Sequence, residues 1–237
     1  MKNISKIILG IVVLFALFFA FTLIAENKSL DAFAQGYSDF KNQQYDTSIY
    51  SYVPIVDGHS ETGEENYFTY LARAVDTKQS NNFRKVNAEQ ALAAYDSMNR
   101  EAIDIFSERI GKLDSAASQL VEAANTIDKH EHRATAVEVA KQARQIQQNY
   151  RDLLLKYVER FNLQTKLLGE LVNNGGDIFA LGNTLKDGGT KIPKIGEDIE
   201  SLMEETEKVS QKMDDLYSSL KGRTGIKDYP NKFTGNK

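Results

Sequence analysis

The chain has 237 residues, of which 41% are hydrophobic and 26% charged, a composition typical of a folded protein that excludes collagen, a disordered chain and a disulfide-stapled miniprotein. The absence of cysteine excludes thiolate zinc sites, thiol nucleophiles, iron–sulfur ligation and a lipid-modified cysteine. The formal net charge of −4 gives no electrostatic reason to expect nucleic acid as a partner.

The strongest signal in the sequence is residues 7–25, an apolar stretch of 19 residues without a charge. A helix rises about 1.5 Å per residue, so this stretch covers roughly 28 Å, enough to cross the hydrocarbon core of a bilayer. Lys2 and Lys6 precede it, which places the N-terminus in the cytoplasm and the bulk of the chain outside. We therefore predict a transmembrane signal anchor at residues 1–25, contact with the lipid bilayer, and a single-pass protein of the cell membrane.

A cleaved signal peptide is the alternative interpretation of the same segment. Signal peptides usually have a shorter apolar core, of about 7 to 15 residues, followed closely by a small-residue cleavage pattern. The only Ala-x-Ala pattern here, residues 32–34, lies beyond the apolar stretch and behind charged residues. The uncleaved anchor is therefore favoured, and the chain is secreted if the segment is cleaved.

Residues 26–86 are expected to form a short helical region rich in Tyr and Phe. Such aromatic side chains favour a packing role, here of a short helical pair against the longer helices that follow. The acidic stretch at residues 57–65 does not match a calcium-binding loop, because Thr62 and Phe68 stand where that loop needs Gly and Glu.

Residues 87–172 carry two apolar patterns with helical spacing. The first runs from Ile103 to Ile127 with alternating steps of three and four residues, which places its members on one stripe of a helix. The second runs from Ala136 to Tyr157 with the same alternation. Each stripe needs an apolar partner, so helices packing on helices are expected.

A helical hairpin is the favoured arrangement of residues 87–172. The two apolar patterns lose register at the polar residues 128–133, and Thr135 with Glu138 forms a capping-box pattern directly after them. A single continuous helix is the alternative, because no Gly or Pro interrupts residues 112–168.

The C-terminal third is divided into three predicted segments. Residues 173–195 are expected to be a Gly-rich connection, which begins where consecutive Asn and Gly residues favour the exit from a helix. Residues 196–221 repeat the apolar pattern and predict an amphipathic helix. Residues 222–237 contain Gly, Pro and four basic residues and are expected to be a disordered basic tail.

No catalytic, cofactor-binding or metal site is predicted. His130 and His132 are two positions apart, so on a helix they point to different sides and would need a loop and a further ligand to hold a metal. The Gly-rich residues 182–191 lack the Gly-Lys-Ser/Thr junction of a phosphate-binding loop. No Ser stands in a recognisable nucleophile elbow.

The predicted fold is all-α: an N-terminal transmembrane or signal-anchor helix followed by an elongated antiparallel helical bundle with coiled-coil-like heptad seams. The side chains expected to mediate packing and self-association share the three apolar stripes. They are Ile103, Phe106, Ile110, Leu113, Leu120, Ile127, Ile146, Tyr150, Ile199, Leu202, Val209, Met213, Leu216 and Leu220.

These observations predict a membrane-anchored extracytoplasmic scaffold or interaction protein, of the adaptor or sensor kind, without catalytic activity and without a cofactor. Its partners would be the bilayer, through residues 7–25, and a protein or a second copy, through the helices. The alternative is a secreted, membrane-active helical protein that forms pores or binds lipid, in which residues 175–195 insert into the membrane.

Overall fold

The computed structural model describes the backbone of residues 2–51 and 67–230, and the side chains of residues 26–49, 51, 69–97 and 99–230. Among the residues whose side chains are described, no helix is long and apolar enough to cross a membrane. The predicted bilayer span at residues 7–25 lies outside the residues whose side chains are described, and so does the acidic stretch at residues 57–65.

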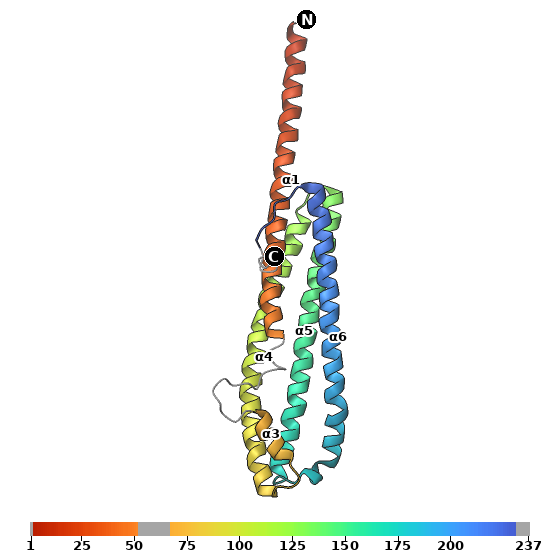
Figure 1. Ribbon diagram of the computed structural model, residues 1–237. Coiled ribbons are helices and arrows are strands. Elements are labelled where there is room, and N and C mark those ends of the chain that lie inside the picture. Colours follow the sequence, from red (N-terminus) through yellow and green to blue (C-terminus); the bar gives the residue numbers. More distant parts are fainter. Residues whose placement is uncertain (1, 52–66, 231–237) are drawn as a thin grey trace. The chain divides into compact units, whose positions relative to one another are not determined.

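The described chain is all-α, as predicted, and its helices pack antiparallel in a bundle that contains no strand in residues 2–51 and 67–230 (Figure 1). The described helices are α1 (Lys2–Ser51), α3 (Tyr67–Val75), α4 (Asn81–Asn125), α5 (His130–Asn173), the 3-10 helix η1 (Ile178–Leu181) and α6 (Gly182–Thr224). The three predicted apolar stripes lie on the long helices α4, α5 and α6.

These helices divide into two compact units. Unit 1 combines Met1–Gln43, Asp114–Gln145 and Val209–Lys237, and unit 2 combines Gln44–Leu113 and Ile146–Lys208. Each unit therefore takes pieces of α1, α4, α5 and α6, and α3 and η1 belong to unit 2 alone.

In unit 1, α1 and α6 run antiparallel along a shared aromatic contact. The ring of Phe33 lies 6.3 Å from the ring of Tyr217, and the ring of Tyr37 stacks on Tyr217 at 3.7 Å. One turn further along α1, Lys41 reaches Ser210 on α6. Residue numbers thus rise on α1 as they fall on α6.

A short turn after Asn125 joins α4 and α5 into a helical hairpin in unit 1. The hairpin arrangement is seen directly in the ion pair between Arg144 and Asp114, whose atoms lie 2.8 Å apart. The helix α5 begins at His130, ahead of the predicted capping box. Thr135 lies inside the helix, where its hydroxyl donates to the carbonyl of Glu131 and does not cap the helix.

The core of unit 2 is aromatic. Phe106 on α4 makes edge-on contacts with Tyr150 and Tyr157 on α5, at ring distances of 6.2 and 6.0 Å. The buried hydroxyl of Tyr157 donates to the carbonyl of Ser51 at the end of α1, so the polar end of this ring is also satisfied.

The side chains of the three predicted apolar stripes lie in the cores of the two units. Most are buried, and the partly buried ones are Ile103, Leu202, Val209 and Leu216. The chain therefore covers its own stripes, and the buried members offer no surface to a second molecule.

The helix α6 begins at Gly182, well before the amphipathic helix predicted from residue 196. Glycine is usually a weak helix former, which is why the sequence suggests a connection here. At Gly188 the absence of a side chain has a packing reason: an added Cβ would lie 2.7 Å from Cδ1 of Leu167 on α5. This glycine lets α6 approach α5 closely and does not interrupt the helix.

Candidate functional site

The most constrained corner of unit 2 is organised around the side chain of Arg84, which is 4% exposed. Its Nε donates to the carbonyl of Gly176 at 2.8 Å, and Nη1 donates to the carbonyls of Asp76 and Gln79. Nη2 donates to the side chain of Asn81. One guanidinium therefore ties the end of α3, the start of α4 and the turn after α5 together.

The turn after α5 fits this corner only with glycine at position 176. Gly176 has φ of 83°, in the left-handed region that disfavours side chains, and an added Cβ would lie 2.0 Å from the carbonyl oxygen of Asn81. The backbone N–H of Gly176 donates to the carbonyl of Leu171, which closes the end of α5. The sequence predicts this helix end, but not the close contact with α4.

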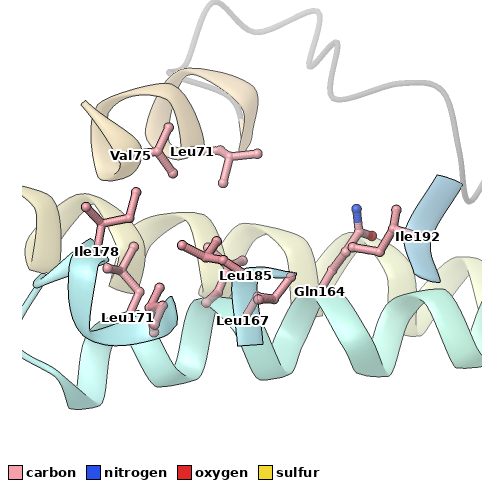
Figure 2. A pocket seen from close by; sticks show the side chains of 10 residues that line it. Leu71, Val75, Gln164, Leu167, Leu171, Ile178, Leu185 and Ile192 are labelled. Atoms are coloured by element: carbon pink, nitrogen blue, oxygen red, sulfur yellow. The ribbon is translucent and has the colours of Figure 1, made fainter. Parts of the chain in front are cut away.

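An apolar pocket of about 180 Å³ lies next to this corner, between α3, α5, η1 and α6 (Figure 2). Gln164 is the one polar side chain on its wall, and its Oε1 accepts a hydrogen bond from the Tyr95 hydroxyl. The rest of the lining is aliphatic: Leu71, Val75, Leu167, Leu168, Leu171, Ile178, Leu181, Leu185 and Ile192.

The surface next to this pocket carries a largely exposed aromatic side chain. Phe179 follows the lining residue Ile178 and is 78% exposed. Its backbone is fixed, because the carboxylate of Asp177 caps η1 by accepting from the N–H of Phe179 at 3.0 Å. An exposed Phe on a held backbone, beside an apolar pocket, has the chemistry of a contact for another apolar group.

A second candidate is the buried polar cluster of unit 1. Lys41 is 3% exposed and its Nζ lies 3.0 Å from the carboxylate of Asp214 and 3.1 Å from Oγ of Ser210. The hydroxyl of Tyr37 donates to the same carboxylate at 2.5 Å. These groups satisfy one another between α1 and α6, so the cluster serves to align the two helices.

Burial dominates the electrostatics of this cluster. Desolvation lowers the pKa of Lys41 although Asp214 acts in the opposite direction. Desolvation, with the charge of Asp214, raises the pKa of Tyr37 far above its ordinary value. Desolvation and the nearby Asp228 raise the pKa of Tyr217 to about 12. At neutral pH both tyrosines are therefore neutral.

His130 and His132 have different surroundings. His132 is buried with Nδ1 at 2.9 Å from the carboxylate of Glu26 on α1, and His130 is exposed at the start of α5. Among the described side chains, no group of three or more His, Cys, Asp or Glu residues is arranged to hold a metal ion.

This pocket was not predicted from the sequence. None of the predicted packing residues lines the pocket, which is built from residues brought together from α3, α5, η1 and α6. The one usable signal was the local apolar cluster at residues 178–181 within a Gly-rich stretch. Arg84 gave no signal, because its role depends on three carbonyl groups supplied by the tertiary fold.

Comparison with known proteins gives no match. The chain matches no protein-family model, no curated protein and no solved structure. Its function is therefore inferred from the geometry of the two units.

Proposed function

We propose that the chain is a membrane-anchored, extracytoplasmic helical interaction module without catalytic activity, and that the apolar pocket of unit 2 is where it holds a protein partner. One observation carries the proposal: an aliphatic pocket of about 180 Å³ stands on a rigid corner beside the exposed ring of Phe179. Exposed apolar surface on a fixed backbone is typical of an interaction site.

The size of the pocket indicates what it holds. An apolar cavity of about 150 Å³ is enough to take up a benzene ring, so this pocket fits one aromatic or branched aliphatic side chain of a partner. Covering a Phe ring such as that of Phe179 contributes about 2 kcal/mol of binding free energy. A side chain of the partner in the pocket and Phe179 beside it would together form a small binding hot spot.

The anchor supports the same function. If residues 7–25 hold the chain in a membrane, its encounters with partners in that envelope take place at raised local concentration, so a small apolar contact suffices. The secreted, membrane-active alternative draws on the same exposed Phe179. It is less favoured because Ile178 and Leu181 of η1 pack on Ala74, Ala88 and Leu171, which leaves a single ring facing outward.

Photocrosslinking from position 179 tests the proposal. The full-length chain would carry benzoylphenylalanine in place of Phe179, and the control would carry it in place of Val137, an exposed apolar residue of unit 1. We expect a discrete protein adduct from position 179 that disappears when Leu185→Trp, at a partly exposed lining position, fills the pocket.

The outcomes separate the two candidate functions. Adducts with lipid alone, together with dye release from liposomes that Phe179→Asp abolishes, would favour the membrane-active protein. Equal adducts from positions 179 and 137 would contradict both functions for this surface.

A further inference from the structure

The segment that follows α6 packs back on unit 1, so the prediction of a disordered tail from residue 222 is wrong for residues 222–230. The helix α6 continues to Thr224, and residues 225–230 follow it without helical structure. At Gly225 the backbone takes a φ of 69°, which favours glycine, and the N–H of Gly225 donates to the carbonyl of Lys221. The chain therefore leaves α6 through a defined turn.

Residues 225–230, which we call the C-terminal clasp, are held at both ends. The side chain of Ile226, directly after the turn, is only 7% exposed. At the other end the hydroxyl of Ser38 on α1 donates to the carbonyl of Pro230 at 2.8 Å. The clasp thus begins on α6 and ends on α1, and it bridges these two helices within unit 1.

The clasp lies near the stacked rings of Tyr37 and Tyr217, which join α1 to α6. Each of these side chains is 6% exposed. Burial is the main cause that raises the pKa of both tyrosines, and the charge of Asp228 in the clasp adds to it. Asp228 also pairs with Lys221 on α6. The clasp therefore lies beside the contact that holds α1 and α6 together.

The clasp itself is held less firmly than the helices that it bridges. It contains one buried aliphatic side chain, that of Ile226. The side chains of Lys221 and Asp228 are 39% and 65% exposed, so their ion pair contributes little to stability. Segments with few buried apolar side chains and no helical hydrogen bonds open locally at a lower free energy than a packed core.

We infer that the C-terminal clasp is a conformational switch element that holds α1 against α6, and that its local opening loosens this junction while the helices stay folded. The helix α1 also carries the predicted anchor at residues 7–25, so the clasp puts the hold on that helix under the control of the opposite end of the chain. The clasp belongs to unit 1 and shares no residue with the pocket of unit 2. Its test is therefore separate from that of the proposed function.

Opening the clasp in the full chain tests the inference. Ile226→Asp puts a charge at a buried apolar position, and we expect the population of the open clasp to rise at least about tenfold. Hydroxyl-radical footprinting in detergent micelles, read by mass spectrometry, reports the exposure of each tyrosine. We expect Tyr37 and Tyr217 to be oxidised severalfold faster, whereas Tyr150, buried in the core of unit 2, should be unchanged.

Three further variants serve as controls. Val137→Asp introduces the same charge at an exposed position of unit 1 and should leave the oxidation of Tyr37 and Tyr217 as in the parent. Ile226→Val keeps an aliphatic side chain and should keep both rings protected. Ser38→Ala removes only the hydrogen bond from α1 to the clasp, so it should expose the same two rings to a smaller extent.

Three outcomes would overturn the inference. Faster oxidation of Tyr229 in the clasp, with Tyr37 and Tyr217 still protected, would mean that the segment frays without loosening the junction. An equal increase at Tyr150 in the Ile226→Asp and Ser38→Ala chains would mean that the whole chain unfolds and that no local opening exists. Equal exposure of the rings in Val137→Asp would mean that any added charge in unit 1 has this effect.

Discussion

The two units are built from pieces of the same helices, but different kinds of contact hold those helices together. Unit 1 places a lysine, a carboxylate and the hydroxyl of Tyr37 between α1 and α6, where these polar groups satisfy one another beside the stacked ring of Tyr217. Unit 2 has an aromatic core, a corner tied by one arginine, and apolar side chains left at its surface. Polar matching fixes the alignment of two helices, whereas uncovered apolar surface is available for binding.

The largest loss of stability is expected from a substitution that disrupts the corner around Arg84 in unit 2. Gly176→Ala adds a Cβ that meets the carbonyl of Asn81 and forces a side chain into a left-handed backbone, so we expect a loss of about 3 kcal/mol or more in unfolding free energy. Denaturant unfolding measures the loss, and amide hydrogen exchange locates it to α3 and the start of α4. Gly189→Ala is the control, because an added Cβ there meets nothing within 4 Å.

Removal of the arginine itself should have a slightly smaller effect. Arg84→Ala leaves the carbonyls of Asp76, Gln79 and Gly176 without this donor, and we expect a loss of about 2 to 3 kcal/mol. Arg100→Ala is the control, since its pair with Asp96 is exposed to solvent and should contribute little to stability. Equal losses in the two variants would show that the corner does not stabilise unit 2.

In unit 1 the corresponding test removes the counter-charge of Lys41. Asp214→Asn keeps the shape of the side chain but leaves a buried cation at Lys41, and we expect a loss of about 2 kcal/mol because Asp214 itself is partly exposed. The double variant Lys41→Met with Asp214→Asn should recover most of this loss. If the double variant is as unstable as the single one, packing and not charge is the cause.

The alkaline stability of unit 1 gives a finer test. Between pH 10 and 12 an unfolded tyrosine loses its proton, whereas Tyr217, whose pKa is raised to about 12, keeps it in the folded chain. The folded state then binds more protons, so stability falls as pH rises through this window. Tyr217→Phe should reduce that fall by about 1 to 2 kcal/mol at pH 12, measured by urea unfolding.

Lys41 acts in the opposite direction over a lower pH window. Its pKa is lowered by burial, so the folded chain releases this proton before the unfolded chain does, and stability rises with pH as 10.5 is approached. Lys41→Met should remove that rise. An identical pH dependence in the variant and the parent would contradict the burial of the ammonium group.

The smallest effect is expected from the exposed ion pair of Lys208 and Glu204 on α6. These side chains lie 3.6 Å apart and are both well exposed, so Glu204→Gln should change the unfolding free energy by less than about 0.5 kcal/mol. A large loss would mean that an exposed pair within one helix contributes as much as the buried groups do, which would remove the contrast.

The sequence predicted the helices better than the surfaces. Alternating spacing identified Phe106, Leu120 and Met213 as core residues because a buried stripe is a local, periodic pattern. The start of α4 was placed at Asn87, whereas the helix begins at Asn81 with the Ser80 hydroxyl accepting from the N–H of Phe83. Phe83 and Val86, the apolar residues of its first turns, are exposed and do not continue the buried stripe.

The remaining features could not be read from a local pattern. Gly188 looked like a loop residue because its close contact with Leu167 depends on another helix. No local pattern marks Lys41 as buried, since its partner Asp214 lies far away in the sequence. The pocket likewise needs four separate elements to exist, so no window of the sequence contains it.

The continuity of α1 has a mechanical consequence. One uninterrupted helix runs from Lys2 through Lys41 to Ser51, and it contributes residues to both units. A helix advances 1.5 Å and turns about 100° per residue, so shifting the predicted anchor by one residue along or around its axis displaces Tyr37 and Lys41 with it. No break in the helix separates these residues, so such a shift would strain the contacts of Tyr37 and Lys41 with Asp214. If residues 7–25 are held in a membrane, a pull or a twist there would strain the pair of Lys41 and Asp214 in unit 1.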